Sequence, residues 1–418
     1  MTQDALRIAL TSYRSKPHCG GQGIYVRQLS RALVDLGHTV EVFSGPPYPD
    51  LVEGVALTQV PSLDLYREPD PFRFPRPSEF RTFSDVLEFA TMCTAGFGEP
   101  RTFSRRVVPL LTARAGEFDV VHDNQTLGSA LLKLPAAGLP LVGTIHHPIT
   151  VDRKLDLQAA PLYRKLAVAR WYGFTRMQAR VAREIALHLT PSSSSSGDVV
   201  RDFQLTADQM RLVPIGVDTD VFRPRGERVP GRIVAMCSAD VPLKGLSVLL
   251  RAMARLPRST NGDLTVVTKL TPGGRTEKLV AELGIADRVR FVCGLSDEEI
   301  AELMASAQLA CVPSLYEGFS LPAVEALASG TPLIASDTAA LPEVVGRDGK
   351  AAILVAPGNV AALSAAIHRL LGDPARRAAM STAARRRAVE KFSWRATAAA
   401  TVDVYREAIA MHREGKPC

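Results

Sequence analysis

The chain has 418 residues, of which 46% are hydrophobic and 22% are charged, and its formal net charge is +7 with a pI near 9.2. These values fit a soluble globular protein large enough for two hydrophobic cores. No window approaches a membrane-spanning apolar run, and residues 1–13 lack a signal-peptide core, so we expect a cytoplasmic protein. The positive charge suits nucleic acid, anionic lipid or an anionic substrate. Because no nucleic-acid motif accompanies it, nucleotide phosphates and a membrane surface remain as partners.

The cysteines and acidic residues give no sign of a metal centre. Six cysteines are scattered along the chain without a C-x-x-C pair, several of them in predicted strands: Cys19, Cys93, Cys237, Cys293, Cys311 and Cys418. We expect buried free thiols, without a zinc site or a disulfide framework. No D-x-D motif follows a predicted strand, so we expect no obligatory metal.

Short β-rich runs alternate with amphipathic helical segments, a pattern typical of parallel α/β layers. Five predicted strands lie in the first half, at residues 7–12, 39–44, 119–122, 141–145 and 186–191. Five more lie in the second half, at residues 232–238, 264–269, 289–294, 309–314 and 332–336. Pro, Gly and charged residues cluster at 213–225, which predicts an interdomain hinge. Ligands bind beyond the carboxyl ends of such strands, so the active site is expected in the cleft between two domains. The serine run 192–196 is expected to be a flexible connection.

Residues 316–337 contain two carboxylates around the start of one predicted helix. Glu317 lies in the loop before this helix and Glu325 about one turn inside it. Both can face a ligand at the helix N-terminus, where free N–H groups and the helix dipole favour phosphate. Beside a phosphate, an ionised carboxylate is best used to accept hydrogen bonds from sugar hydroxyls. For an isolated pair of glutamates the alternative is that both merely favour a helix N-terminus.

This segment resembles the E-x7-E signature of the GT4 family of retaining glycosyltransferases, which have the GT-B fold. Four other segments, in the family's order, extend the resemblance along nearly the whole chain: residues 20–45, 214–224, 243–253 and 392–409. The resemblance implies an α/β protein of two facing Rossmann-like domains with parallel sheets and an interdomain cleft. The N-terminal, acceptor-side domain would comprise residues 1–213, completed by a C-terminal helix 395–418. The donor-side domain would comprise residues 214–394.

The resemblance also implies how the donor is held. Gly20 and Gly21 would let the backbone approach the donor diphosphate, although a plain turn needs the same residues. Lys244 matches the lysine that stabilises the charge of the leaving diphosphate. The family usually has an arginine shortly before this lysine, where this chain has Ala239. Lys269 either supplies the positive charge that the missing arginine would bring to the diphosphate, or it is a solvent-exposed residue at the end of a strand.

On the acceptor side, the loop after residues 141–145 contains His146 and His147. By resemblance, His146 contacts the donor sugar, and its backbone carbonyl helps to stabilise the oxocarbenium-like centre. His147, Asp123 and Asn124 are acceptor-binding candidates, and the last two could instead cap a helix.

Two further regions are candidate acceptor territory. Residues 70–83 alternate Phe, Pro and Arg, as expected of an irregular ordering loop or an interface. Residues 162–183 form a predicted basic helix. This helix either lies on the anionic inner surface of a membrane or packs against the first domain with its charged side facing solvent.

The resulting hypothesis is a retaining, metal-independent transfer of a sugar from a UDP- or GDP-sugar to a natural product, lipid or glycan. The leaving phosphate would accept the acceptor's proton on the same face. Glu317 would hold the donor sugar, Glu325 the ribose diol and Lys244 the diphosphate. The segment Gly318, Phe319, Ser320 and Leu321 would grip sugar and phosphate, mainly through backbone N–H groups. A nucleotide-sugar 2-epimerase and a noncatalytic sugar-nucleotide-binding scaffold are the rival hypotheses.

Overall fold

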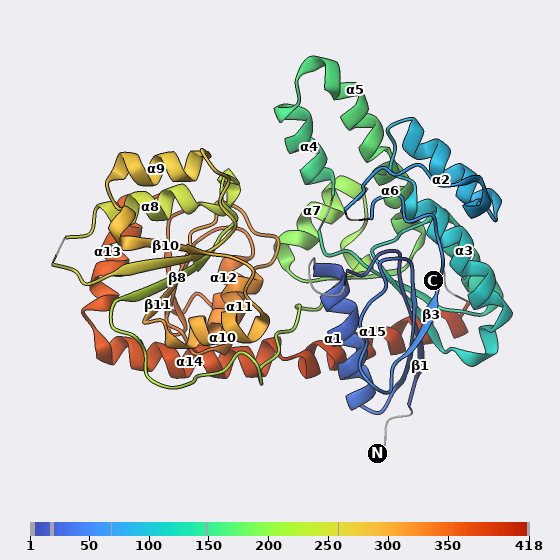
Figure 1. The fold of residues 1–418 in the computed structure, drawn as a ribbon. Helices are drawn as coiled ribbons and strands as arrows, with labels where there is room; N and C mark the ends of the chain where they lie inside the picture. Colours follow the sequence, from blue (N-terminus) through green and yellow to red (C-terminus); the bar gives the residue numbers. More distant parts are fainter. Residues whose placement is uncertain (1–4, 17–20, 68, 148, 258, 416–418) are drawn as a thin grey trace. The chain divides into compact units, whose positions relative to one another are not determined.

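The computed structural model describes residues 5–16, 21–67, 69–147, 149–257 and 259–415. Its chain divides into two compact units, one of Met1–Val213 with Thr397–Cys418 and one of Pro214–Ala396. Each unit is built on one parallel sheet that carries helices on both faces (Figure 1). The predicted α/β class with two parallel sheets is therefore confirmed.

The sheet of unit 1 has seven strands in the order β3-β2-β1-β4-β5-β6-β7. The strands are β1 (Arg7–Ser12), β2 (Thr39–Ser44), β3 (Ala56–Gln59), β4 (Val120–Asn124), β5 (Leu141–Thr144), β6 (Leu187–Thr190) and β7 (Met210–Leu212). The helices are α1 (Gly21–Asp35), α2 (Phe83–Cys93), α3 (Glu99–Ala113), α4 (Thr150–Ala159), α5 (Leu162–Trp171), α6 (Thr175–Glu184), α7 (Ser193–Phe203) and, from Thr397 onward, α15 (Trp394–Arg413). The central strand β1 pairs in parallel with β2 and β4, so their carboxyl ends share one edge of the sheet.

The sheet of unit 2 has six strands in the order β10-β9-β8-β11-β12-β13. The strands are β8 (Arg232–Met236), β9 (Asp263–Val267), β10 (Val289–Val292), β11 (Leu309–Val312), β12 (Leu333–Ser336) and β13 (Ala352–Val355). The helices are α8 (Leu246–Ala254), α9 (Arg275–Leu283), α10 (Asp297–Ser306), α11 (Leu321–Ala328), α12 (Leu341–Val345), α13 (Val360–Leu371) and α14 (Pro374–Phe392).

Apolar cores cover both faces of the unit 2 sheet, which explains why β8, β11, β12 and β13 each contain three or four consecutive apolar residues. Ala310 and Val312 of β11 belong to the core that includes residues of α10, α11, α12 and α14. Leu309 and Cys311 belong to the opposite core, which includes residues of α8, α9 and α13. The alternation follows from the two-residue period of a strand. This burial fixes the register of β11 and hence the position of the loop that follows it.

Several local expectations were wrong. The predicted basic helix 162–183 is broken into α5 and α6 by a short 3₁₀ turn at Tyr172–Phe174. The serine run is not a flexible connection: Ser192 caps α7, its side chain accepting a hydrogen bond from Ser195 N, and the following serines form the first turn.

The cysteine prediction was partly wrong. The four cysteines among the described residues are free thiols, of which Cys237 and Cys311 are buried whereas Cys93 and Cys293 are exposed. Cys93 lies in the last turn of α2 and Cys293 just after β10, where the packed layers end.

Candidate active site

Three of the predicted donor residues follow neighbouring strands of the unit 2 sheet. Lys269 follows β9, Lys244 follows β8 and Glu317 follows β11, and β8 pairs with both β9 and β11. Because the carboxyl ends of parallel strands meet at one edge, the three side chains belong to the same edge. This edge is where open α/β sheets bind ligands.

Lys244 and Glu317 form an ion pair. Lys244 Nζ lies 3.0 Å from Glu317 Oε1 and also 3.0 Å from Oε2. Ser314 Oγ donates a further hydrogen bond of 2.8 Å to Glu317 Oε1. The Glu317 side chain is 8% exposed, while that of Lys244 is 38% exposed. The carboxylate is thus held by two partners while the ammonium group remains accessible.

Gly245 explains how Lys244 is brought to this carboxylate. Its φ is +68°, a left-handed conformation that favours glycine. A Cβ atom there would lie 2.0 Å from Pro313 O, in the loop that follows β11. The missing side chain therefore lets the loop after β8 lie directly against the loop after β11, and Leu315 N donates to Leu243 O at 2.8 Å across the same contact.

Helix α11 begins where the sequence predicts. Ser320 is its N-cap and accepts a 3.4 Å hydrogen bond from Ala323 N, and Pro322 occupies the first turn. Within the described chain, the N–H groups of Phe319, Ser320 and Leu321 donate no hydrogen bond. Gly318 directly precedes these three residues. Unengaged donors at a helix N-terminus can bind an anion or sugar oxygens.

Glu325 lies in the second turn of α11, and its Oε2 atom is buried without a hydrogen-bond partner among the described residues. Burial, reinforced by the charge of Asp297, raises the pKa of this carboxyl to about 7. An unsatisfied buried acceptor is costly unless a ligand supplies a donor. Glu325 is therefore suited to accept hydrogen bonds from hydroxyl groups.

The segment around Ala239 uses a different set of contacts from those expected of an arginine. Ala239 N donates a 2.9 Å hydrogen bond to Thr268 Oγ1 at the end of β9. The neighbouring Asp240 has φ +60° and accepts hydrogen bonds from Thr276 N and Oγ1 at the start of α9. Lys269 is exposed in the loop after β9. No local sequence pattern marks Thr268 or Thr276, because both meet this segment only through the tertiary fold.

In unit 1, His146 is held by three neighbours that follow or cover the strand ends. Its Nε2 lies 2.7 Å from Asn124 Oδ1, its backbone N–H donates to Gln125 Oε1 at 2.8 Å, and its ring meets the Tyr25 ring edge-on at 4.4 Å. Burial lowers the pKa of His146 to about 4, so the imidazole is neutral near pH 7. Gln125 also donates to His147 O at 2.7 Å, which fixes the histidine loop. Sequence reasoning missed Gln125 and Tyr25.

The remaining unit 1 candidates differ in exposure. Asp123 and Asn124 are fully buried. Asp123 accepts from Thr11 Oγ1 at 3.1 Å and from Leu127 N at 2.8 Å, and burial raises its pKa to about 6. His147 is more accessible and its Nε2 lies 3.2 Å from Asp152 Oδ2.

The glycine turn is only partly described. Gly21 is the first residue of α1, whereas Gly20 lies outside the described residues. A helix starting directly after β1 has its N-terminus at the carboxyl edge of the unit 1 sheet, on the side of His146.

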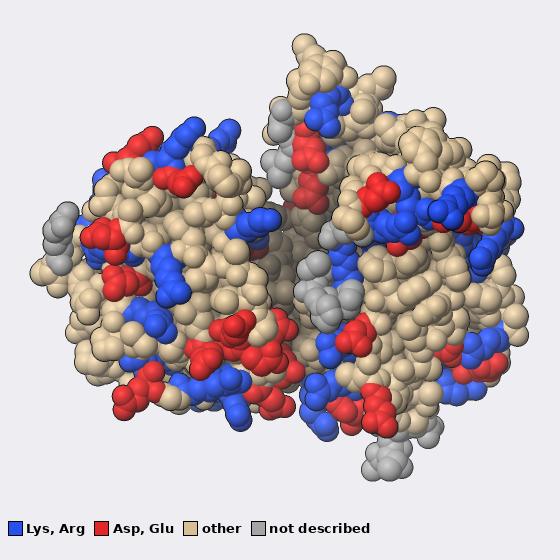
Figure 2. Space-filling view, viewed as in Figure 1, with Lys and Arg blue, Asp and Glu red and all other residues tan. Residues whose placement is uncertain are grey.

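The surface and side-chain clusters add little to this site. On the face that Figure 2 shows, Asp and Glu side chains gather in one patch near the lower edge of unit 2, whereas Lys and Arg are interspersed with Asp and Glu over unit 1. Among the described residues, no group of three or more His, Cys, Asp or Glu side chains is arranged to hold a metal ion. No helix in the described part of the chain is long and apolar enough to cross a bilayer.

Comparison with known families matches both halves of the chain. Residues 19–221 match the model of glycosyltransferase family 4, and residues 218–387 match the model of glycosyl transferases group 1. Among solved structures, the chain is similar to sucrose-phosphate synthase from Thermosynechococcus elongatus, with a TM-score of 0.67 and 26% identity over 97% of this chain and 99% of that one. HepE of Anabaena in complex with UDP shares the fold, with a TM-score of 0.66 and 17% identity over 96% and 100% of the two chains.

Two curated relatives differ in their closeness to this chain. An MMP alpha-(1->4)-mannosyltransferase of Mycolicibacterium hassiacum is 60% identical over 406 residues, which cover 97% of this chain and 99% of the relative. A D-inositol 3-phosphate glycosyltransferase of Streptomyces avermitilis is 30% identical over 99% of this chain and 90% of the relative. The chain therefore belongs to the group 1, family 4 type of glycosyltransferases and is an enzyme of the GT-B fold.

Proposed function

We propose that this enzyme is a retaining α-mannosyltransferase that transfers mannose from a nucleoside diphosphate mannose to a hydroxyl group of a glycan. The observation that carries the proposal is the Lys244–Glu317 pair beside the unengaged N–H groups at the start of α11. A fixed cation and N–H donors suit a diphosphate, and the carboxylate suits sugar hydroxyls. The mannose and the α-(1→4) linkage are taken from the relative that is 60% identical.

In the proposed reaction, Lys244 stabilises the negative charge that develops on the leaving diphosphate. Glu317 accepts hydrogen bonds from hydroxyls of the donor sugar, and the N–H groups of Phe319, Ser320 and Leu321 bind sugar and phosphate oxygens. Each group is held by the fold before the donor arrives, so little reorganisation accompanies the reaction. A cation positioned in this way performs the charge stabilisation that a metal ion performs in other enzymes, and the reaction is proposed to need no metal.

The stereochemical part of the proposal follows from the anomeric configuration. An α-linked product formed from an α-linked donor keeps the configuration of the anomeric carbon. In the proposed same-face route, the bond to the phosphate oxygen breaks while the acceptor oxygen approaches from the same side. The leaving phosphate oxygen takes the proton of the acceptor hydroxyl. Protons and charges are therefore balanced, and no nucleophile from the protein is needed.

Unit 1 is proposed to supply the acceptor side. His146 contacts the donor sugar, with its backbone carbonyl near the developing positive charge, and the neutral ring is oriented by Asn124. Because Asp123 and Asn124 are fully buried, we assign them the positioning of the loops, and His147 the contact with the acceptor. Gly21, together with Gly20, would approach the diphosphate through the backbone. Lys269 is the proposed second cation.

The test is product analysis with mannose donors carrying GDP or UDP, in the presence and absence of a mannoside acceptor. We expect an α-linked disaccharide only when acceptor is present. Release of an epimerised sugar without acceptor would support the 2-epimerase alternative instead. Binding of nucleotide without any turnover would support a noncatalytic scaffold. The nucleotide that gives the larger thermal stabilisation identifies the donor, because a ligand that binds only the folded state stabilises it by mass action.

Helix α5 favours a second element of the proposal, peripheral contact with the inner face of a membrane. Leu162, Tyr163 and Leu166 are 86%, 84% and 82% exposed, and Arg164 and Lys165 lie among them. Apolar side chains flanked by cations suit an anionic bilayer surface. Sedimentation with vesicles of anionic or neutral lipid tests this element: binding only to anionic vesicles, lost on Leu162→Ser with Leu166→Ser, is the expected result, and equal recovery with and without vesicles would refute it.

A further inference from the structure

A pocket of 610 Å³ lies in unit 1, away from the histidine loop. Its lining comes from four segments: the loop after β3, the 3₁₀ turn Pro77–Glu79, the start of α2 and one face of α3. The segment 70–83, which alternates Phe, Pro and Arg, contributes Glu79, Arg81 and Thr82 to this lining. Neither the proposed donor site nor the proposed acceptor loop uses any of these residues.

The lining combines an apolar wall with polar groups of both kinds. The apolar wall is formed by Val60, Pro61, Leu63, Pro109 and Leu110. Three hydroxyl side chains, three guanidinium groups and two carboxylates complete the lining: Ser62, Thr82, Ser84, Arg81, Arg105, Arg106, Glu79 and Asp85. The pocket therefore offers both hydrogen-bond donors and acceptors next to an apolar surface.

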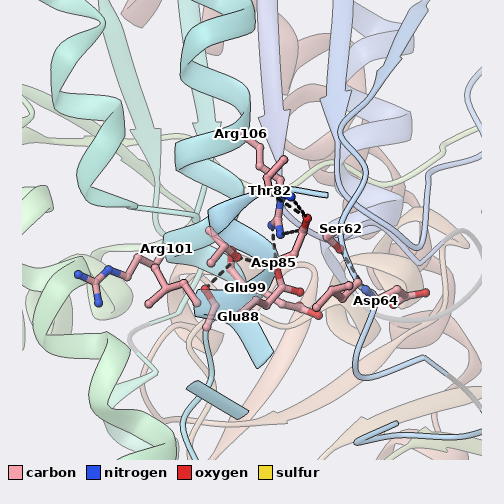
Figure 3. Close-up of polar contacts among 12 residues, drawn as sticks. Ser62, Asp64, Thr82, Asp85, Glu88, Glu99, Arg101 and Arg106 are labelled. Atoms are coloured by element: carbon pink, nitrogen blue, oxygen red, sulfur yellow. Dashed lines mark hydrogen bonds and ion pairs between the residues drawn. The ribbon is translucent and has the colours of Figure 1, made fainter. Parts of the chain in front are cut away.

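The inner side of the pocket is rigid. Arg106 of α3 donates to Asp85 Oδ1 at 2.6 Å and to Glu88 Oε2 at 2.7 Å, so it bridges two turns of α2. Asp85 in turn accepts hydrogen bonds from the backbone N–H and hydroxyl of Thr82, at 2.7 and 2.9 Å. Figure 3 shows Thr82, Asp85 and Arg106 drawn together, with Ser62 on the adjacent loop. These contacts join α2 to α3 at the inner side of the pocket.

Two cations at the rim have no ion-pair partner among the described residues. Neither Arg81 nor Arg105 forms an ion pair with any carboxylate of the described chain, and both are exposed. The Arg105 guanidinium lies 5.6 Å from the centre of the Phe83 ring, which is itself 69% exposed. An exposed aromatic ring and guanidinium groups without an ion-pair partner, beside a pocket, are features of a binding surface.

The chemistry of the lining suits a polyhydroxylated ligand with an apolar face. Both carboxylates of the lining are already engaged, Glu79 by Arg73 and Asp85 by Arg106 and Thr82. The polar groups open to a ligand are therefore the hydroxyl side chains and the rim guanidinium groups. Sugar hydroxyls both donate and accept, so they can use the hydroxyl side chains and the guanidinium groups together. The C–H face of a sugar ring matches the wall of Val60, Leu63 and Leu110.

The pocket also lies at the edge of the sheet where an acceptor is expected. Val60 directly follows β3, and its N–H donates to Ser44 O at the carboxyl end of β2. Asn124, at the carboxyl end of β4, lies on the same edge, three strands away in the order β3-β2-β1-β4. Three strand spacings correspond to about 14 Å. An oligosaccharide can span this distance within unit 1.

We infer that this pocket is a second saccharide-binding site, which holds a remote part of a glycan acceptor while its reacting end lies near His146. The inference rests on the proposed glycosyl transfer to a glycan. Its ligand class is a neutral α-linked oligosaccharide, bound by the Arg81 and Arg105 guanidinium groups and the apolar wall. The site makes the enzyme prefer long acceptors to short ones.

The test compares α-(1→4)-mannotetraose with methyl α-mannoside as acceptors. The double variant Arg81→Ala/Arg105→Ala is expected to lower kcat/KM for the tetrasaccharide by about tenfold or more, through KM, because charged hydrogen bonds are lost. Turnover of methyl α-mannoside should change little. Arg101→Ala is the matched control, since Arg101 is an exposed arginine of the same helix that points away from the cluster in Figure 3. Equal losses with both acceptors, or no loss with the tetrasaccharide, would overturn the inference.

A binding experiment without donor separates this inference from the proposed function. Calorimetric titration of mannotetraose is expected to show binding to the parent protein and to Arg101→Ala, and weaker binding to the double variant. This result would stand even if the protein transferred no mannose to any acceptor, which would contradict the proposed function alone. Equal binding by all three proteins, no binding by the parent protein, or binding of inorganic phosphate in place of the tetrasaccharide would overturn the second site.

Discussion

Replacement of Glu325 by Gln tests the proposed grip on the ribose. Glu325 Oε2 is buried and has no partner among the described residues, so a ribose hydroxyl would be its first donor. A hydrogen bond to a charged group contributes about 1.5 to 3 kcal/mol. We therefore expect the Kd for the nucleoside diphosphate to rise by roughly 10- to 150-fold. Gln has nearly the shape of the protonated acid, so the fold should be kept.

A double-mutant cycle, in which both the protein and the ligand are changed, shows whether the lost affinity comes from the contact between Glu325 and the ribose. Calorimetry would measure GDP or UDP, whichever binds, and its 2′-deoxy and 3′-deoxy analogues, against the parent protein and Glu325→Gln. If Glu325 binds the diol, removing the hydroxyl should cost much less in the variant than in the parent protein. Glu302→Gln, an exposed carboxylate on the neighbouring α10, is the control. Strictly additive losses would refute the ribose assignment.

The pH dependence provides a second check. Burial, followed by the charge of Asp297, raises the pKa of Glu325 to about 7, so the carboxyl is mostly protonated at pH 6 in the free protein. A diol binds better to the ionised form, and nucleotide affinity should therefore rise with pH until it levels off above 7, by at most about tenfold per pH unit. The nucleotide's own phosphate titration is the same for both proteins. Parallel pH profiles of the parent protein and Glu325→Gln would contradict the assignment.

Three further predictions concern the other groups of the proposed site. Glu317→Gln should lower kcat by about 100-fold or more while the Kd of the nucleoside diphosphate, measured by calorimetry, stays within a few fold, because its contact is to the transferring sugar. Gly245→Ala should lower both the thermal midpoint and nucleotide affinity. A φ of +68° costs an L-residue about 1 to 2 kcal/mol, and the new Cβ would meet Pro313 O. A nucleotide Kd equal to that of the parent protein would refute the role of this contact. Asn124→Ala should lower kcat more than it raises the KM of the donor, because His146 loses its 2.7 Å partner, and steady-state kinetics with unchanged kcat would show that the ring needs no such support.

The strands that could be predicted are those whose pattern of apolar residues indicates that they are buried. β1 and β2 were predicted to the residue, as Arg7–Ser12 and Thr39–Ser44, because each has three apolar side chains among six residues and is bounded by polar residues at both ends. β3 was missed because Ala56–Gln59 is a largely exposed edge strand with little apolar signal. β7 was missed because only three residues pair, and β13 because a run of four apolar residues, Ala352–Val355, also fits a helix.

The site residues follow the same division between local and tertiary signals. The positions of Glu317, Glu325 and Lys244 relative to strands and helices could be read from spacing, since each lies within a few residues of an element end. Gln125 could not be found, because its partners His146 and His147 lie in another loop. Ser314 lies only three residues before Glu317, but nothing in its spacing marks it as a hydrogen-bond donor to that carboxylate. Gln125 even has φ +56°, a conformation that no side-chain pattern announces. Spacing along the chain thus locates side chains on elements, whereas their hydrogen-bond partners depend on how the loops pack.

The buried histidines of unit 1 carry a further consequence for stability. Burial lowers the pKa of His122 to about 3 and the pKa values of His146 and His188 to about 4. At a pH between these pKa values and about 6.5, each histidine is neutral in the folded protein but protonated in the unfolded chain. Stability from these groups is therefore present above pH 6.5 and is lost as the pH falls. Glu99 and Asp123 act in the opposite direction, because burial raises their pKa values to about 8 and about 6.

Because these opposing titrations partly cancel, a pH scan of the parent protein alone does not isolate any of them, and the last prediction uses a single replacement. His122 Nδ1 lies 2.6 Å from Tyr405 Oη of α15, and Nε2 lies 2.5 Å from Thr144 Oγ1. His122→Gln should lower the thermal midpoint most at pH 7.5, where it removes these bonds. Below pH 6.5 the difference in free energy of unfolding between the parent protein and the variant should shrink by about 1.2 kcal/mol per pH unit. The reason is that the folded variant no longer contains a buried imidazole that excludes a proton. The exposed His368→Gln is the control. A difference between His122→Gln and the parent protein that stays constant from pH 7.5 to 5 would mean that His122 takes up its proton equally in both states, and the argument from burial would fail.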